Sequence, residues 1–473
     1  MFSSTKWLLA FGLAWLSSCP PIHAQPSTLA ALQALADGQA DASTALQSAI
    51  DAQHGSLVIP KGRYLLKQTL EIRLDQSEYC VLRGDGPVTL VMAASGPAIR
   101  LLGTHERSAD PAGFAPQVWQ RERMPLLDGI AIEGAHRDAE GIVARGTMEM
   151  TLAHLHLRKL KHGVHLVGNN RNVLIDACHI YENSGIGVFY DDVNLHQSNI
   201  VGCHISYCDG GGVVARRGNV RNVHISGCDI ESNMSRDQPA TANVLIDCRD
   251  SEYGTAEVAI TGCTLQHNSV GPDSCNIRIL GGSRQASTGT ANREGHVTIT
   301  GNVLSDVAVN VHLQSCRGVT LTGNTFWMGY EHNLLVEQCS HIVMAANNMD
   351  RNPRYDYGTA LQTKNAVVFR NCEDCTLTGL HIAHVWKCPA GLVLENCRRL
   401  NVSGATILDC EHIGILAKNV SQSLIANCLI SHATATVDQF KPLVVEGGRD
   451  NRIDITTPGW APQGLAPEGT SPR

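Results

Sequence analysis

The chain has 473 residues and a formal net charge of −7, and 43% of its residues are hydrophobic but only 5% are aromatic. A chain of this length can bury a large core, and the scarcity of aromatic residues favours a long, narrow core of aliphatic side chains and cysteine. The negative charge excludes the basic balance of a nucleic-acid-binding protein. After the first 25 residues we find no apolar run long enough for a membrane span.

Residues 1–24 have the pattern of a secretory signal peptide. Lys6 precedes the apolar run WLLAFGLAWL, and IHAQ provides a small residue before a cut after Ala24. A second interpretation takes LSSC as a lipoprotein box that would leave a lipidated Cys19. We favour the plain cut because Pro20 and Pro21 follow that cysteine. Both interpretations predict an exported protein, which is secreted, periplasmic or anchored through Cys19.

Residues 35–75 are the predicted N-terminal cap. Ser43 or Thr44 can cap a short helix over residues 45–52. Such a helix can cover the open end of a solenoid core. The corner into the first coil is then formed by Pro60, Gly62 and Tyr64.

A short motif recurs along the rest of the chain, as in VHISGCDIESN from Val223, VAITGCTLQHN from Val258 and VTITGNVLSDV from Val297. The steps are 22 to 25 residues, with a few longer ones, as expected for a coil of fixed circumference with loop insertions. Apolar and polar residues alternate within each unit, which predicts strands. A second strand follows in each unit, as in GVHLV from Gly163. The residue after the Gly of each motif forms the anchor column: Ala153, Cys178, Cys203, Cys228, Cys263, Asn302, Asn324, Asn347, Leu380, Ala405 and Cys428.

These features predict an all-β fold, a single-stranded right-handed parallel β-helix (a solenoid) over residues 25–455 with an N-terminal capping helix. Identical side chains stacked about 4.8 Å apart form ladders, here of Cys and then Asn. A second Cys ladder is predicted at Cys316, Cys339, Cys372 and Cys397. Parallel, in-register Cβ atoms are too far apart for a disulfide, so most of the 17 cysteines are expected to be buried free thiols. Residues 456–473 are predicted to be a disordered Pro/Gly-rich tail.

The segment LADGQADASTALQSAIDAQHGSLVIPKGRYLLKQTLEI from Leu35 resembles the opening of the pectate-lyase-like superfamily, and the coils resemble its generic repeat. This resemblance implies a carbohydrate-active class that includes pectate lyases, polygalacturonases, alginate lyases and epimerases, and also phage tailspikes. A fold alone does not choose among these activities.

One outward column, at the end of the second strand, carries the candidate site. Long insertions follow the same strand at residues 103–128, 191–197, 249–257 and 281–296, and a wall of loops beside a charged row makes a groove. Trp119 and Tyr253 lie on these insertions and could stack on sugar rings. Outward charges also occur on any β-helix, and His165, His196 and His204 are interpreted as surface or turn residues. The candidate row is Arg145, Asp191, Asp192, Arg216, Arg217 and Asp247.

Two chemistries fit this row. In a lyase that cleaves an acidic, uronate-containing polysaccharide by β-elimination, Asp191, Asp192 and Asp247 would hold Ca²⁺, and Arg216 or Arg217 would take the proton. In an inverting hydrolase, Asp191 and Asp247 would be acid and base, about 9.6 Å apart by coil spacing. The polygalacturonase and epimerase motifs are missing, so the lyase is favoured. A non-catalytic carbohydrate-binding or surface protein is the third alternative.

Overall fold

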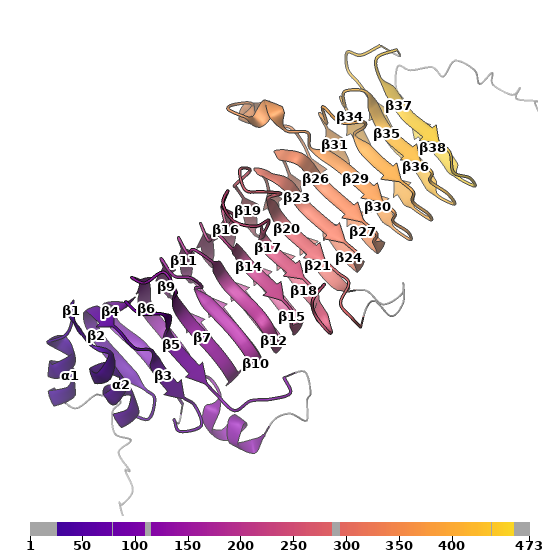
Figure 1. The fold of residues 1–473 in the computed structure, drawn as a ribbon. Coiled ribbons are helices and arrows are strands. Elements are labelled where there is room, and N and C mark those ends of the chain that lie inside the picture. The colour runs from indigo at the N-terminus through magenta and orange to yellow at the C-terminus, as the bar shows by residue number, and fades with distance from the viewer. Residues whose placement is uncertain (1–25, 78, 109–114, 286–293, 437, 458–473) are drawn as a thin grey trace, which may run out of the picture.

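The computed structural model is a rod of stacked coils (Figure 1) that describes residues 26–77, 79–108, 115–285, 294–436 and 438–457. The predicted signal peptide, Cys19 and most of the predicted tail lie outside these residues. All the strand pairs in the described chain are parallel, and each strand pairs with its equivalents one coil earlier and one coil later. The predicted parallel β-helix is confirmed.

Each full coil passes through three faces, which we call A, B and C in chain order. In one coil these are β14 (Gly211–Arg216), β15 (Asn219–Ser226) and β16 (Asp229–Glu231). We call the turn from face A to face B the AB corner and the turn from face C to the next face A the CA corner.

The remaining strands follow the same scheme. Face A contains β3 (Leu70–Arg73), β5 (Gly96–Leu102), β7 (Ala139–Met148), the first parts of β10 (Val164–Asp176) and β12 (Ile186–Val201), β17 (Ala242–Asp247), β20 (Cys275–Leu280), β23 (Val307–Gln314), β26 (Gly329–Glu337), β29 (Ala366–Arg370), β32 (Leu392–Glu395), β35 (Ile413–Lys418) and β37 (Lys441–Glu446). Face B contains β8 (Thr151–Ala153), the later parts of β10 and β12, β18 (Gly254–Thr261), β21 (Gly295–Thr300), β24 (Arg317–Thr322), β27 (Ser340–Ala345), β30 (Thr376–Thr378), β33 (Asn401–Ser403), the first part of β36 (Leu424–Ser431) and β38 (Arg452–Thr456). Face C contains β9 (His156–Arg158), β11 (His179–Tyr181), β13 (His204–Ser206), β19 (Thr264–Gln266), β22 (Val303–Leu304), β25 (Thr325–Phe326), β28 (Asn348–Met349), β31 (His381–Ala383), β34 (Thr406–Leu408) and the end of β36.

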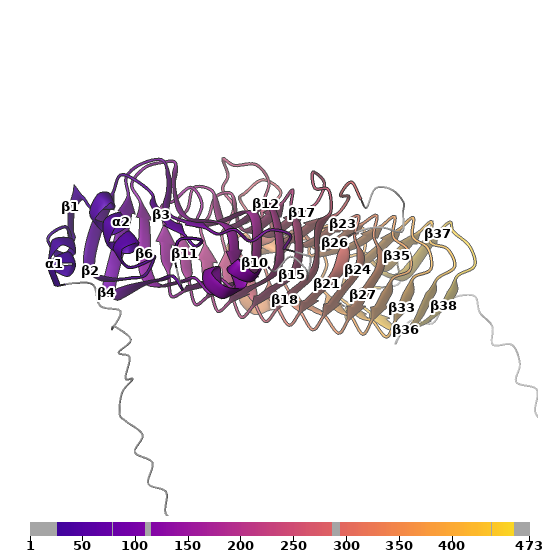
Figure 2. The same ribbon diagram turned by 90° about the horizontal axis from the view of Figure 1, so that it is seen from below.

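The N-terminal end of the rod differs from this scheme. There β2 (Leu57–Leu66), β4 (Val81–Met92) and β6 (Leu126–Gly134) are long enough to run through faces B and C together, and β1 (Asp37–Asp41) pairs with β2. Two helices, α1 (Pro26–Gln33) and α2 (Ser43–Ala52), lie at this end (Figure 2). Leu46 and Ile50 of α2 are buried, as a cap over an apolar core requires.

The predicted capping of this helix by a Ser43 or Thr44 side chain is wrong. Ala42 occupies the N-cap position, and no side chain caps the helix there. The Ser43 hydroxyl donates to Asp41 Oδ1 at 2.6 Å and accepts from the Lys67 backbone N–H at 2.9 Å. Its hydrogen bonds therefore link the helix to the first coil.

The anchor column lies inside the rod as predicted, with every member at most 8% exposed. Its members are hydrogen-bonded between coils: the Cys203 N–H donates to Cys228 Sγ at 3.5 Å, and Asn302 Nδ2 donates to Asn324 Oδ1 at 3.0 Å. The 16 cysteines in the described part of the chain are all free thiols, and only Cys388 among them is not fully buried. Within the described residues, no helix is both long and apolar enough to cross a bilayer.

Candidate functional site on face A

The strand register of face A places four of the six predicted residues, Arg145, Asp191, Arg216 and Asp247, in one column with one residue per coil. Asp192 and Arg217 follow at the corner, with φ values of 46° and 65°. Asp191 pairs with Arg216 and Arg216 pairs with Asp247, so these three lie on successive coils. Arg145 lies two coils before Asp191. Beyond Asp247 the column continues through Leu280, Gln314, Glu337, Arg370, Glu395 and Lys418. We call this row the charged column.

Asp191 is held by side chains from the coils on either side of it. Its Oδ2 lies 3.2 Å from Nε2 of His165, and Nδ1 of the same ring lies 2.9 Å from Oε2 of Glu140. Arg217 donates to the other oxygen of Asp191. Burial lowers the pKa of His165, but the hydrogen bonds and charges of Glu140 and Asp191 outweigh it and raise the pKa. His165 is therefore the centre of a carboxylate bridge, and its interpretation as a plain surface residue misses this.

Asp247 also has a partner, and it lies two residues further along the chain. Arg249 binds both of its carboxylate oxygens, at 2.9 and 2.7 Å. Burial raises the pKa of Asp247, but the Arg249 hydrogen bonds outweigh it, and the pKa is lowered. The side chain of Arg216, between the two aspartates, forms no hydrogen bond or ion pair in the described part of the structure, although its charge helps to lower the pKa of Asp247.

The three carboxylates predicted to bind Ca²⁺ do not come together. Asp191 and Asp247 are two coils apart, and each is bound to an arginine. Asp192 lies at the AB corner, where its backbone has a φ of 46°. Among the described residues, no cluster of three or more His, Cys, Asp or Glu side chains is placed to hold a metal ion. These residues do not fit a calcium site.

The predicted substrate-binding residues have contacts of other kinds. Arg145 is exposed and packs beside Gly168. The Cζ atom of Arg123 lies 5.2 Å from the ring centroid of Trp119, in the insertion between β5 and β6. Tyr253 is 52% exposed, and its carbonyl accepts a hydrogen bond from Arg221 at 3.1 Å.

The predicted wall is present only in part, where two AB-corner loops meet beside Asp247. The insertion predicted at residues 191–197 is wrong, because these residues belong to the continuous strand β12. The backbone N–H groups of Arg284 and Gln285 donate to the carbonyls of Ser251 and Glu252, each at 3.0 Å. Arg284 also forms an ion pair with Glu252 at 2.9 Å. The two insertions therefore support each other as one ridge.

A cavity of about 340 Å³ lies on face A towards the C-terminal end of the rod. The outward side chains of Val368, Val393 and Leu416, in register on three successive strands, line it and form an apolar floor. Part of the charged column and the CA-corner loops also line it. Its polar and charged side chains are Glu331, His332, Lys364, Arg370, Lys387, Glu395 and Lys418. We call it the cationic cavity, because four Lys and Arg side chains meet only two carboxylates there.

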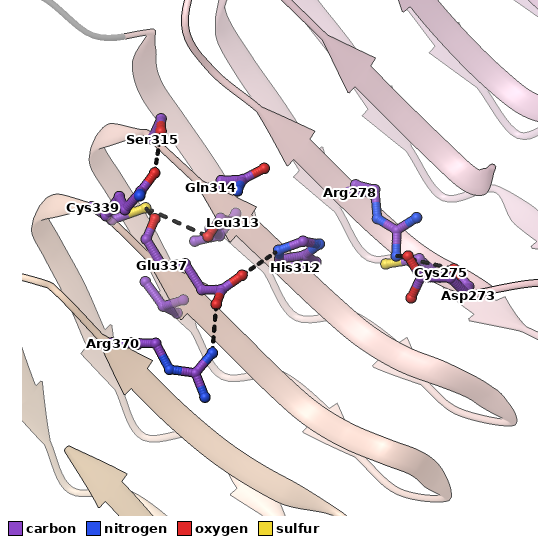
Figure 3. Close-up of polar contacts among 12 residues, drawn as sticks. Asp273, Cys275, Arg278, His312, Leu313, Gln314, Ser315, Glu337, Cys339 and Arg370 are labelled. Atoms are coloured by element: carbon purple, nitrogen blue, oxygen red, sulfur yellow. Dashed lines mark hydrogen bonds and ion pairs between the residues drawn. The ribbon is translucent and has the colours of Figure 1, made fainter. Parts of the chain in front are cut away.

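Hydrogen bonds fix the part of the charged column that borders this cavity (Figure 3). Arg370 donates from Nη1 to Glu337 at 2.7 Å and from Nε to Glu395 at 3.0 Å, so its guanidinium links three coils. Nε2 of His312 lies 3.3 Å from the other oxygen of Glu337. Lys418 Nζ lies 3.4 Å from Glu395.

Two histidines beside this network are poised to be neutral. Burial lowers the pKa of His332, and the nearby Glu331 carboxylate does not offset it. Burial and the charge of Arg278 lower the pKa of His312, although Glu337 acts in the opposite direction. The side chain of Arg278 is only 5% exposed and pairs with Asp273 at 2.9 Å. Of the two histidines, His332 lines the cavity.

Comparison with known proteins agrees with the fold. A family profile described as "Right handed beta helix region" matches residues 126–271, and one described as "Periplasmic copper-binding protein (NosD)" matches residues 253–365. No curated protein matches the chain by sequence. The chain is a right-handed parallel β-helix, as predicted.

Several solved structures are similar to it. Tailspike protein 3 of bacteriophage CBA120 is 14% identical with a TM-score of 0.53, over 91% of this chain and 61% of that one. A tailspike mutant of Escherichia coli bacteriophage HK620, in complex with a hexasaccharide, is 13% identical with a TM-score of 0.51, over 88% and 77%. The A-module of a mannuronan C-5 epimerase from Azotobacter vinelandii is 13% identical with a TM-score of 0.41, over 90% and 99%. The chain thus spans less than two thirds of the CBA120 tailspike, and the likeness concerns the fold.

Proposed function

We propose that the protein is an exported, carbohydrate-active β-helix protein that binds an acidic polysaccharide on face A and cleaves it by β-elimination in the cationic cavity. One observation carries this proposal: a cavity with four cationic side chains and a neutral histidine over an apolar floor. The chain as a whole has a net charge of −7, so the positive charge is local to this cavity. Carboxylates are the groups that such a surface attracts.

The cavity supplies what the elimination of a uronate requires. Lys364, Lys387 and Arg370 can bind and neutralise the sugar carboxylate, which makes the neighbouring C–H more acidic. His332, held neutral by burial, can take that proton as general base. The bond to the glycosidic oxygen then breaks, a double bond forms in the sugar, and the departing oxygen is protonated from an ammonium group or water. The floor of Val368, Val393 and Leu416 can support the apolar face of the sugar ring.

An inverting hydrolase has less support. It needs a carboxylic acid with a raised pKa to protonate the leaving group. In the cavity, the hydrogen bond from Arg370 lowers the pKa of Glu395, and Glu331 is paired with Lys364. In the predicted row, Arg249 keeps Asp247 ionised. These carboxylates are poor proton donors.

The structural neighbours and one family profile are compatible with this proposal. The HK620 tailspike was solved in complex with a hexasaccharide, and the NosD profile describes a periplasmic protein. An extracytoplasmic location would bring the protein to polysaccharides of the envelope or the surroundings. Arg216, whose side chain forms no hydrogen bond or ion pair among the described residues, is a second contact point for the same polymer.

The test is a substrate panel. The purified protein is incubated with pectate, alginate and glycosaminoglycans, and both the ultraviolet absorbance of an unsaturated product and new reducing ends are measured. A lyase gives both signals, a hydrolase gives reducing ends alone, and a binding protein gives neither but is retained by the polymer. Because the predicted Ca²⁺ ligands do not form a site, we expect the activity to survive a chelator. Reducing ends without absorbance would overturn the proposal.

A further inference from the structure

A second cavity, of about 470 Å³, lies on a different part of the rod, where β10, β12 and β15 turn from the AB corner onto face B. Its volume is in the range of a site for a small ligand. It is lined by Asn172, Val173, Leu174, Gln197, Asn199, Asn222 and His224. We call it the amide cavity, since four side-chain amides from three successive coils surround it.

The same backbone turn occurs on the three coils that line this cavity. Asn172, Gln197 and Asn222 have φ values of 53°, 68° and 58°, in the left-handed region. Asn enters this region more readily than most residues, whereas Gln does so at a cost. The cavity is also lined by Leu174, Asn199 and His224, which are in register on three successive strands of face B.

The amides of this cavity have unused hydrogen-bonding capacity. The Oδ1 atom of Asn172 is buried and has no partner among the described residues. In the same part of the chain, the side chains of Gln197 and Asn199 form no hydrogen bond, whereas Asn222 Nδ2 lies 3.0 Å from His196 Nε2. Each amide offers an acceptor oxygen and two donors. The exposed amides of Gln197 and Asn199 are open to a ligand that donates and accepts hydrogen bonds.

The charge of the cavity selects the class of ligand. Of the residues that the structure describes, no Asp, Glu, Lys or Arg lines it, in contrast to the cationic cavity on face A. Amides that both donate and accept are matched by hydroxyl groups, which do the same. Leu174 adds a small apolar surface for the C–H groups of a ring.

We propose that the amide cavity is a binding site for an uncharged, hydroxyl-rich saccharide. It is separate from the proposed lyase site, because it lies at face B and no Asp, Glu, Lys or Arg among the described residues lines it, whereas the cationic cavity lies on face A. The amide cavity would bind neutral sugar units of a mixed polymer, or a second neutral glycan, while the cationic cavity binds and cleaves at acidic sugar units.

The test measures binding of maltohexaose, cellohexaose and xylohexaose to the full-length protein by titration calorimetry, with an oligogalacturonate of equal length as the charged counterpart. We expect at least one neutral oligosaccharide to bind, and Asn199→Leu to weaken that binding at least tenfold. Asn401→Leu is the matched control, because Asn401 is an exposed asparagine in the same outward column of face B, outside the cavity. The Asn401→Leu variant should bind the neutral oligosaccharide with the same affinity as the unmodified protein.

Three results would overturn this inference: no binding of any neutral oligosaccharide, an equal loss in both asparagine variants, or binding of the oligogalacturonate alone. Lys364→Ala separates the two proposals. It should abolish cleavage of acidic polymers and leave neutral binding unchanged, so either proposal can fail without the other.

Discussion

Arg370 donates one hydrogen bond to Glu337 at 2.7 Å and another to Glu395 at 3.0 Å, and so it spans three coils at the edge of the cationic cavity. Both of its partners are carboxylates on the same face, one coil before it and one coil after it. A guanidinium fixed in this way presents its remaining N–H groups in a set direction. Lysine has no such planar fork.

We therefore expect Arg370→Ala to raise the KM for an acidic substrate about tenfold, which corresponds to the loss of one charge-assisted contact. Arg370→Lys should recover only part of this loss. Because the side chain is 42% exposed, the free energy of unfolding should change by no more than about 1 kcal/mol. Arg398→Ala, which removes a similar Arg–Glu pair between coils, at 2.8 Å, should leave KM unchanged. Equal effects of the two alanine variants would show that Arg370 has no special role.

The pH dependence of kcat/KM should show the titration of His332. Burial lowers its pKa from the ordinary value of 6.5, so the neutral base is present at pH 7 and is lost only as the pH falls through the lowered pKa. Glu331→Gln removes a carboxylate that favours the protonated ring and should move the acid limb to still lower pH. An acid limb that stays in place would mean that another group titrates.

Stability should fall in acid because of His162. Burial lowers the pKa of this ring to about 4, and its Nδ1 accepts the Ile186 N–H at 3.1 Å. The unfolded state binds the proton near pH 6.5, and the folded state binds it only near pH 4. The contribution of the neutral His162 ring to the free energy of unfolding is therefore full above pH 6.5 and is lost as the pH falls towards 4. His162→Asn keeps an acceptor without the titration, so thermal unfolding should be less sensitive to pH in this range. An unchanged pH dependence would contradict this account.

The cysteine ladder should contribute through its hydrogen bonds as well as its packing. Cys228 Sγ accepts the buried N–H of Cys203 at 3.5 Å. Cys228→Val keeps an apolar side chain but removes the acceptor, so we expect a loss of about 1–3 kcal/mol in denaturant unfolding. Cys228→Ser keeps an acceptor and should cost less. The opposite order would indicate that only apolar packing matters at this position.

The sequence predicts the periodic part of this protein well, because one residue per coil repeats the same environment. The anchors from Cys178 to Cys428 are buried, and Arg145, Asp191, Arg216 and Asp247 are in register as expected. Periodicity fixes which residues share a column. It does not fix which charges pair, and so the bonds of Asp247 to Arg249 and of Asp191 to His165 were not foreseen.

The cationic cavity was missed for a related reason. Lys364 and Lys387 lie on CA-corner loops, whose paths have no period, whereas the predicted wall relied on insertions at the AB corner only. One signal was present: the step of 33 residues from Asn347 to Leu380 is among the longest in the repeat. This insertion carries the two 3₁₀ turns Pro353–Tyr355 and Ala360–Gln362 and ends beside the cavity at Lys364.

The most direct measurement compares the rate of unsaturated product formation on the best acidic substrate for the unmodified protein, His332→Gln and Arg216→Ala. If His332 is the base in the cationic cavity, His332→Gln should lower kcat by about 10²–10⁴-fold. Arg216→Ala should mainly raise KM, because Arg216 only contacts the polymer. Near-complete loss of turnover in Arg216→Ala, with full activity in His332→Gln, would place the chemistry in the row around Asp191 and contradict the account.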